Sequence, residues 1–171
     1  ESRIRGTSLL ARTLATLHHP PAVFVSASAV GYYGNHAGND LVDEQTPKGS
    51  GFRADVVEAW EGATAPAQAA GIRVATTRFG LVLSPRGGAL AVMLPIFQAG
   101  LGGKVGSGDQ VWSWVTLPEV VGAISHVISQ TEVQGPVNVT APKAVTNREF
   151  THVLGKVLNR PTVFTAPPFA L

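Results

Sequence analysis

Short apolar runs alternate with segments of helical character along nearly the whole chain, and this alternation constrains the fold most. Residues 22–26 and 72–78 form runs that are rich in Val, Ile, Phe and Ala, as buried parallel strands are. Residues 136–140 predict a further strand. Strands separated by helices favour right-handed βαβ units. The pattern therefore predicts an α/β fold with a mainly parallel sheet.

Helices and turns fill the intervals between these strands. An N-terminal helix carries apolar Leu9, Leu10, Leu14 and Leu17 and should end before Pro20. Further helices are expected at 52–70, 89–98, 118–130 and 147–158, with strands at 111–116 and 162–165. Asn147 is expected to cap the helix that it begins. Residues 31–51 predict a long loop, and loops of that length are usually functional or mobile.

Composition excludes several classes of protein. The 171 residues suit one domain with a sizeable core, and 14% charged residues with a net charge of +2 leave no basic stripe for nucleic acid. The chain has no cysteine, which excludes disulfides and fits a reducing, cytoplasmic compartment. No apolar run reaches the roughly 18 residues of a membrane span. No metal site is expected, because metal-ligand spacing is lacking among His18, His19, His36, His126 and His152.

The first candidate site follows the strand at 22–26. The segment 26–34 is small and polar, and ligands of open α/β sheets bind outside the carboxyl ends of strands. The Ser28 hydroxyl could hydrogen-bond a reacting carbonyl or carbinol. The alternative is a polar turn whose serines bond their own backbone.

Arg78 is the second candidate, because it ends the strand at 72–78 on the same edge of the sheet. Its guanidinium could hold a phosphate or carboxamide group of a cofactor. The alternative is an ion pair with Asp43 or Glu44.

The segment 26–34 resembles the Ser-Ser-Ser-Ala-x-Val-Tyr-Gly stretch of extended short-chain dehydrogenases/reductases. Matches to one branch, the epimerase-like proteins often labelled nucleoside-diphosphate-sugar epimerase, extend over nearly the whole chain. They include Trp60-Glu61, Arg78-Phe79-Gly80-Leu81-Val82-Leu83-Ser84, Gly87-Gly88-Ala89-Leu90, Ser113-Trp114-Val115 and Asn138-Val139-Thr140-Ala141-Pro142. The resemblance implies a Rossmann-like, doubly wound sheet. Residues 1–84 would form the C-terminal half of the NAD(P)-binding domain, and 85–171 a mixed region that binds substrate and returns to the sheet.

The resemblance also implies the ligands. It predicts NADP, in preference to NAD, held by Ser26, Ala27, Arg78 and Gly80, with Ser28 as a catalytic residue. It implies a longer protein, with a Gly-rich phosphate-binding turn before Glu1 and a further segment after Leu171. A homodimer could form through the first helix and the 52–70 helix, where Leu9, Leu10, Val56 and Val57 could serve an interface or simply the core.

Sugar-modifying relatives carry a Tyr-x-x-x-Lys pair on the helix after the serine loop, and this chain lacks it. In either possible register, Phe52 with Val56 or Arg53 with Val57, no Tyr or Lys is present. The branch that the chain resembles lacks the pair too. Tyr32 or Tyr33 could supply the proton in its place.

The glycine-rich stretch 100–108 lies where extended relatives bind the nucleotide part of their second substrate. The resemblance therefore assigns Gly102, Gly103, Lys104 and Gln110 to substrate binding, and simple turn formation is the alternative. Taken together, the residues and the resemblance predict an NAD(P)-binding epimerase or oxidoreductase that acts on a small substrate, free or nucleotide-linked. The alternative is a non-catalytic dinucleotide-binding module with a regulatory or scaffold role, in line with the cell-division-inhibitor label of some relatives.

Overall fold

The computed structural model describes residues 1–35 and 40–167, and they form two compact units. The first unit comprises Glu1–Phe79 and Pro118–Val139, and the second comprises Gly80–Leu117 and the chain from Thr140 onward. The chain thus leaves the first unit after Phe79 and returns to it with the segment Pro118–Val139.

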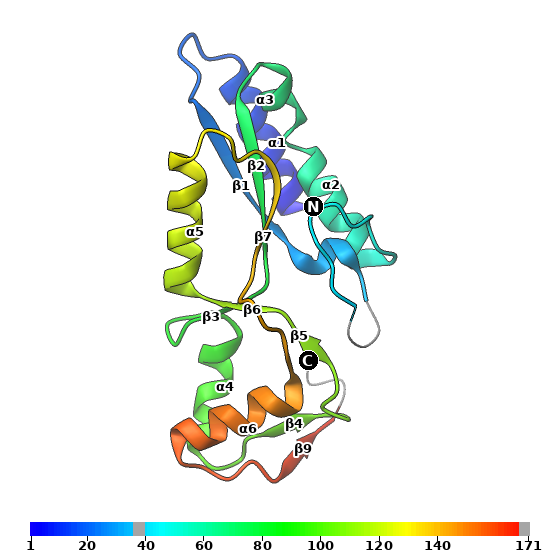
Figure 1. The fold of residues 1–171 in the computed structure, drawn as a ribbon, viewed down its shortest axis with the longest axis vertical. Helices are drawn as coiled ribbons and strands as arrows, with labels where there is room; N and C mark the ends of the chain where they lie inside the picture. The colour runs from blue at the N-terminus through cyan, green and yellow to red at the C-terminus, as the bar shows by residue number, and fades with distance from the viewer. Residues whose placement is uncertain (36–39, 168–171) are drawn as a thin grey trace. The chain divides into compact units, whose positions relative to one another are not determined.

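A parallel sheet of three strands organises the first unit. Its strands are β1 (Val23–Ala29), β2 (Arg73–Phe79) and β7 (Gly135–Val139), in the order β1-β2-β7. Helices α1 (Ser2–Ala15), α2 (Phe52–Gly62) and α3 (Ala65–Ala69) lie on one side, and α5 (Leu117–Ser129) lies on the other (Figure 1). This arrangement confirms the predicted α/β, Rossmann-like fold with a mainly parallel sheet.

The central position of β2 explains its continuous apolar sequence. Helices cover both faces of the sheet, and residues 74–78 are all buried. Phe24 of β1 joins Ile72 and Val74 in a core that α1 and α3 complete through Ala11 and Ala67.

The strand register brings three polar residues into one row. Ser28 of β1 pairs with Arg78 of β2, and Arg78 pairs with Asn138 of β7. All three lie near the carboxyl ends of their strands, so the sheet alone places them side by side.

Two expected elements of the first unit have different limits in the structure. The 52–70 helix is divided into α2 and α3, because Pro66 has no N–H for a continuous helix and instead occupies the first turn of α3. The strand expected at 22–26 extends to Ala29. A 3-10 helix, η1 (Val30–Tyr33), then begins the segment that the sequence predicts as loop.

The second unit contains three small sheets. In it β3 (Leu81–Leu83) pairs with β6 (Trp114–Thr116), β4 (Gly103–Val105) with β9 (Phe164–Ala166), and β5 (Val111–Trp112) with β8 (Val145–Thr146). Its helices are α4 (Gly88–Gln98) and α6 (Asn147–Leu158). The expected strand 111–116 is interrupted at Ser113, whose carbonyl accepts a hydrogen bond of 2.7 Å from Leu81 N.

The N-terminal cap of α6 corrects a sequence prediction. Thr146, and not Asn147, caps the helix: its hydroxyl accepts from Glu149 N, and the Glu149 carboxylate accepts from Thr146 N. The Asn147 side chain is fully buried and instead accepts a 2.8 Å hydrogen bond from Val105 N. Asn147 therefore joins α6 to β4.

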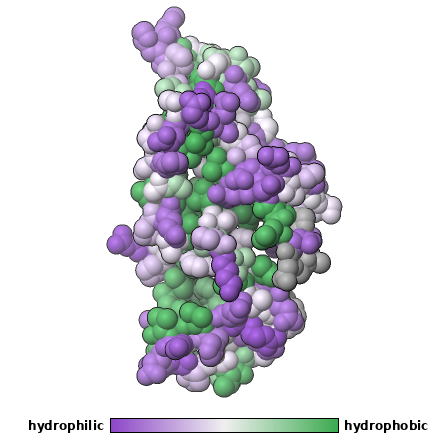
Figure 2. Space-filling model, in the orientation of Figure 1, coloured by the Kyte–Doolittle hydropathy of each residue, from purple (hydrophilic) through white to green (hydrophobic). Residues whose placement is uncertain are grey.

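Apolar side chains also reach the surface of the second unit. Figure 2 shows hydrophobic residues over α4, where Val92 and Ile96 are 72% and 50% exposed. Across residues 1–35 and 40–167, no helix combines the length and apolar character that a membrane crossing requires.

Candidate functional site

Arg78 is the centre of a buried hydrogen-bonded network in the first unit. Its Nε and Nη2 donate to Oε1 and Oε2 of Glu61 at 2.8 and 2.9 Å, and the Arg78 side chain is 3% exposed. The partner is thus Glu61 of α2, and the alternative of an ion pair with Asp43 or Glu44 is wrong. Glu44 instead accepts a 2.7 Å hydrogen bond from Asn138 N, which attaches the 40–50 segment to the end of β7.

Ser28 belongs to the same network. Its hydroxyl donates to Glu61 Oε1 at 2.5 Å, and the residue is 3% exposed. Ser28 therefore bonds a carboxylate from another element and not its own backbone. Ser26 behaves as the alternative interpretation expects, since its hydroxyl contacts the neighbouring Ala27 carbonyl at 3.4 Å.

The two tyrosines of η1 have different roles. The Tyr33 hydroxyl accepts a hydrogen bond from Arg78 Nη1 at 3.0 Å and donates one to Asn138 Oδ1 at 2.7 Å. It is therefore engaged both as an acceptor and as a donor. The Tyr32 ring lies over the guanidinium, with Arg78 Cζ 3.5 Å from its centroid. Tyr32 is half-buried, and its hydroxyl has no hydrogen bond to another residue that the structure describes.

These contacts fix the charge of Arg78. Burial acts to lower the pKa of the guanidinium, but the hydrogen bonds to Glu61 and Tyr33 outweigh it, so the net pKa lies above the ordinary value. All three guanidinium nitrogens already have partners. The contact of Arg78 with a cofactor phosphate stays a prediction. It would require a ligand to reach a side chain that is almost entirely shielded from solvent.

Helix α2 presents one stripe of side chains to the end of β1. Arg53, Val57 and Glu61 follow one another at intervals of four residues, and Glu61 bonds Ser28. A Cβ atom at Gly31 of η1 would lie 3.7 Å from Arg53 Cβ and 3.8 Å from Val57 Cγ2. Of the two registers that the sequence leaves open, Arg53 with Val57 is therefore the one that faces η1. Phe52, of the other register, is 83% exposed.

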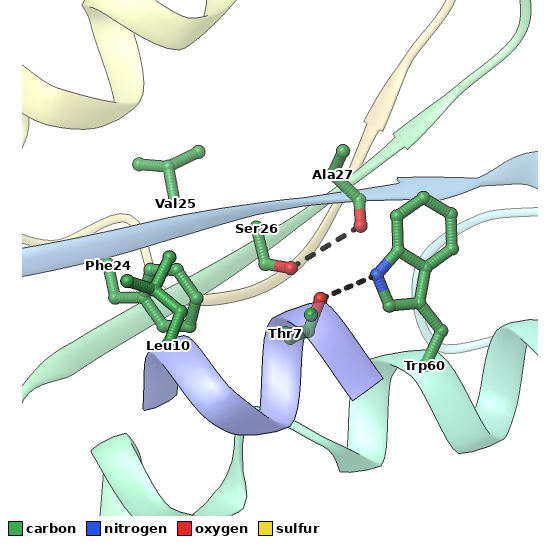
Figure 3. A pocket seen from close by; sticks show the side chains of 8 residues that line it. Thr7, Leu10, Phe24, Val25, Ser26, Ala27 and Trp60 are labelled. Carbon is green, nitrogen blue, oxygen red and sulfur yellow. Dashed lines mark hydrogen bonds between the residues drawn. The ribbon is translucent and has the colours of Figure 1, made fainter. Parts of the chain in front are cut away.

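Two predicted cofactor-binding residues line a small cavity between α1, β1 and α2. Its volume is about 220 Å³, and Figure 3 shows Thr7, Leu10, Phe24, Val25, Ser26, Ala27 and Trp60 around it. Trp60 Nε1 donates to Thr7 Oγ1 at 2.9 Å and closes one side. Ligand pockets usually measure roughly 300–1,000 Å³, so this cavity is too small for a whole dinucleotide.

Gly80 and the residues predicted to bind substrate lie in the second unit, where packing accounts for the glycines. A Cβ at Gly80 would lie 2.7 Å from the Ser113 carbonyl oxygen. A Cβ at Gly102 would lie 2.6 Å from the Phe97 ring, and one at Gly103 2.0 Å from the Phe164 carbonyl oxygen. All three glycines are thus required for the close approach of neighbouring elements, whatever they bind.

Lys104 and Gln110 complete the predicted substrate-binding set. Lys104 Nζ donates to Ser107 O at 3.2 Å, and Gln110 Nε2 donates to Val105 O at 3.2 Å. Both side chains therefore hold the 104–110 turn. Their role in substrate binding stays a prediction.

The remaining candidates are dispersed. His18, His19, His126 and His152 are exposed, and His36 lies outside the described residues. Val57 is 6% exposed and so belongs to the core, whereas Leu9 is 71% exposed and could serve an interface.

Sequence reasoning missed Glu61 and Asn138 as members of the site. Both lay in matched motifs, yet neither had a role assigned. The signal that could have found Glu61 is the four-residue interval that links it to Val57 and Arg53. No local signal marks Asn138, because its partner Tyr33 is 105 positions away in the chain.

Comparison with known proteins agrees with this architecture. No protein-family profile matches the chain. An epimerase family protein of Mycobacterium bovis is 46% identical over 171 residues, which are 100% of this chain and 56% of that protein. A chloroplastic SDR39U1 homologue of Arabidopsis thaliana, also an epimerase family protein, is 41% identical over 99% of this chain and 49% of its own length.

Solved structures give the same result. The human epimerase family protein SDR39U1, crystallised with NADPH, superposes with a TM-score of 0.91 at 33% identity and covers 97% of this chain and 56% of its own. The nucleoside-diphosphate sugar epimerase of Corynebacterium glutamicum has a TM-score of 0.82 at 37% identity, over 99% of this chain and 37% of its own. The chain spans about half the length of the curated relatives that it matches. Over its whole length, the chain is thus similar to proteins named as members of the epimerase family.

Proposed function

We propose that the protein containing this chain binds a nicotinamide dinucleotide, NADP(H) in preference to NAD(H), at the carboxyl ends of β1 and β2. The observation that carries the proposal is the row of Ser28, Arg78 and Asn138, which the strand register brings to one edge of the sheet. Open α/β sheets bind ligands at this edge. The NADPH in the crystal structure of the human relative supports the choice of cofactor.

The residues at this edge fit a flat, uncharged ring better than a phosphate. Ala27 is exposed, and Ala29 and Tyr32 are half-buried, so small side chains and one aromatic ring face any ligand there. The only buried cation among the described residues, Arg78, is already neutralised by Glu61. The nicotinamide end of the dinucleotide therefore suits this edge, and its phosphates would be held by residues outside the row of Ser28, Arg78 and Asn138.

When bound, the dinucleotide would supply hydride transfer to or from a small substrate, free or nucleotide-linked. Tyr32 would transfer the proton that accompanies the hydride, because its hydroxyl has no hydrogen bond to a described residue. The Tyr33 hydroxyl, by contrast, already donates one hydrogen bond and accepts another. Glu61 would orient the Ser28 hydroxyl, and Arg78 would hold Glu61 and the Tyr32 ring in place.

The test is a fluorescence titration of the whole protein with NADPH and NADH, followed by a turnover screen with nucleotide sugars and small carbonyl compounds. Tighter binding of NADPH than of NADH, with turnover that Tyr32→Phe abolishes while NADPH affinity is kept, is the expected result. Failure of the wild-type protein to bind either dinucleotide would overturn the proposal.

One observation favours a second function, a dinucleotide-binding regulatory or scaffold module without turnover. The α2 stripe that faces the end of β1 carries Arg53 and Val57, and neither can replace a Tyr-Lys pair as acid and base. NADPH binding with no turnover of any compound in the screen would support this function over the first.

A further inference from the structure

We infer that Arg53 binds an anionic group, a phosphate or a carboxylate, of the ligand at the end of β1. The inference rests on the proposed function only for the location of the ligand. Its basis is the stripe of α2 in which every fourth residue faces the end of β1 or the η1 helix that follows it. Glu61 bonds Ser28, Val57 lies against Gly31, and the stem of Arg53 lies against the same glycine.

The Arg53 stem lies beside Gly31 of η1. A Cβ there would stand at ordinary contact distance, 3.7 Å, from Arg53 Cβ. The Arg53 stem thus starts beside η1, one residue from Tyr32, and the side chain is exposed. A guanidinium carried on this stem can reach a ligand that lies at the end of β1.

Arg53 has no acidic partner among the described residues. The other carboxylates of α2 are in use: Lys48 Nζ bonds Asp55 Oδ1 at 2.8 Å and Glu58 Oε2 at 2.9 Å, and Glu61 is held by Arg78. Arg53 is therefore the uncompensated positive charge next to η1.

Helix stability does not account for this arginine. Arg53 lies in the first turn of α2, where the helix macrodipole disfavours a positive charge. Lys48, by contrast, satisfies two acids near the same helix end. Arg53 is thus unfavourable for its helix and lacks a counter-charge. An anionic ligand would supply that counter-charge. The planar guanidinium suits both phosphate and carboxylate, because it can donate two parallel hydrogen bonds to either.

The test compares Arg53→Gln and Arg53→Lys with Arg12→Gln, a matched control that removes an exposed arginine from α1. Calorimetric titrations of the whole protein would use NADPH, and then inorganic phosphate and malonate with NADPH present. We expect Arg53→Gln to weaken at least one of these probes about tenfold or more, Arg53→Lys to weaken it less, and Arg12→Gln to leave all of them within about twofold.

The probe that responds identifies the source of the anion. Loss of NADPH affinity alone assigns Arg53 to a cofactor phosphate, and loss of phosphate or malonate affinity assigns it to the substrate. Equal affinities of Arg53→Gln and Arg12→Gln for every probe, or no binding of phosphate or malonate with unchanged NADPH binding, would overturn the inference. Failure of the wild-type protein to bind NADPH would instead contradict the proposed function. The phosphate and malonate titrations would still decide the role of Arg53.

Discussion

Glu61 of α2 and Arg78 of β2 form two parallel hydrogen bonds, of 2.8 and 2.9 Å, with side chains that are 15% and 3% exposed. Ser28 and Tyr33 bond the same pair from the end of β1 and from η1. Because both charges are largely removed from water, each depends on the other for solvation. The pair therefore connects α2 to the strand ends at which the ligand is proposed to bind.

Glu61→Gln should destabilise the protein strongly. The substitution keeps the size of the side chain but leaves the Arg78 cation buried without its counter-charge, which typically costs about 3 kcal/mol. Urea unfolding would measure this change. Lys48→Gln is the control: it removes two ion pairs whose acidic partners, Asp55 and Glu58, are exposed, and we expect it to cost less than about 1 kcal/mol. Equal costs for the two variants would contradict a structural role for the Glu61–Arg78 pair.

Tyr33→Phe and Tyr32→Phe should have unlike effects on stability. Removal of the Tyr33 hydroxyl leaves Arg78 Nη1 and Asn138 Oδ1 without a partner and should cost about 1–3 kcal/mol. Tyr32→Phe keeps the ring over the guanidinium, so its unfolding free energy should stay within about 0.5 kcal/mol of wild type. Chemical denaturation of both variants provides the comparison, and a costly Tyr32→Phe would mean that its hydroxyl has a partner after all.

Gly103→Ala should weaken the second unit through the β4–β9 pair. The new methyl group would fall 2.0 Å from the Phe164 carbonyl oxygen, so one strand has to move. Overpacking of this kind costs about 1–3 kcal/mol. Gly122→Ala is the control, because nothing lies within 4 Å of its Cβ position in α5. It should instead stabilise the helix by about 0.5–1 kcal/mol. Thermal unfolding that moves in the same direction for both variants would not fit the structure.

The capping box of α6 should make stability depend on acid pH. Backbone and side-chain hydrogen bonds from Thr146 hold the pKa of Glu149 below its ordinary value. A carboxyl with a depressed pKa in the folded state contributes stability above its unfolded pKa, about 4.3, and loses it as pH falls through the lower folded value. The unfolding midpoint should therefore fall in this acid window. Glu149→Gln, which can still form the box but does not titrate, should show a shallower decline.

Thr151→Val should leave the second unit as stable as wild type or make it more stable. The Thr151 hydroxyl is buried and lacks a hydrogen-bond partner among the described residues, as do Asn147 Nδ2 and Gln110 Oε1. Replacement of an unpaired buried hydroxyl by a methyl group of similar shape removes a desolvation cost of about 1–3 kcal/mol. A loss of more than about 1 kcal/mol in urea unfolding would show that the hydroxyl is bonded, for instance through an internal water molecule.

The sequence by itself determined the element types and much of the location of the candidate site. Apolar runs predicted β1 and β2, and Pro and Gly bounded most of the helices, because these signals act between residues a few positions apart. The same reasoning placed Ser28 and Arg78 at one edge of the sheet. It misplaced the cap of α6 by one residue and joined α2 to α3, where local signals compete.

Only the tertiary structure decided the partners. It chose Glu61 over Asp43 and Glu44 for Arg78, separated the bonded Tyr33 from Tyr32, and set Arg53 and Val57 toward the end of β1. The bonds of the network join residues 17, 33, 45 and 105 positions apart. Such contacts depend on strand register and on which face a helix packs. Both follow from burial of the whole apolar surface, and no short stretch of sequence records them.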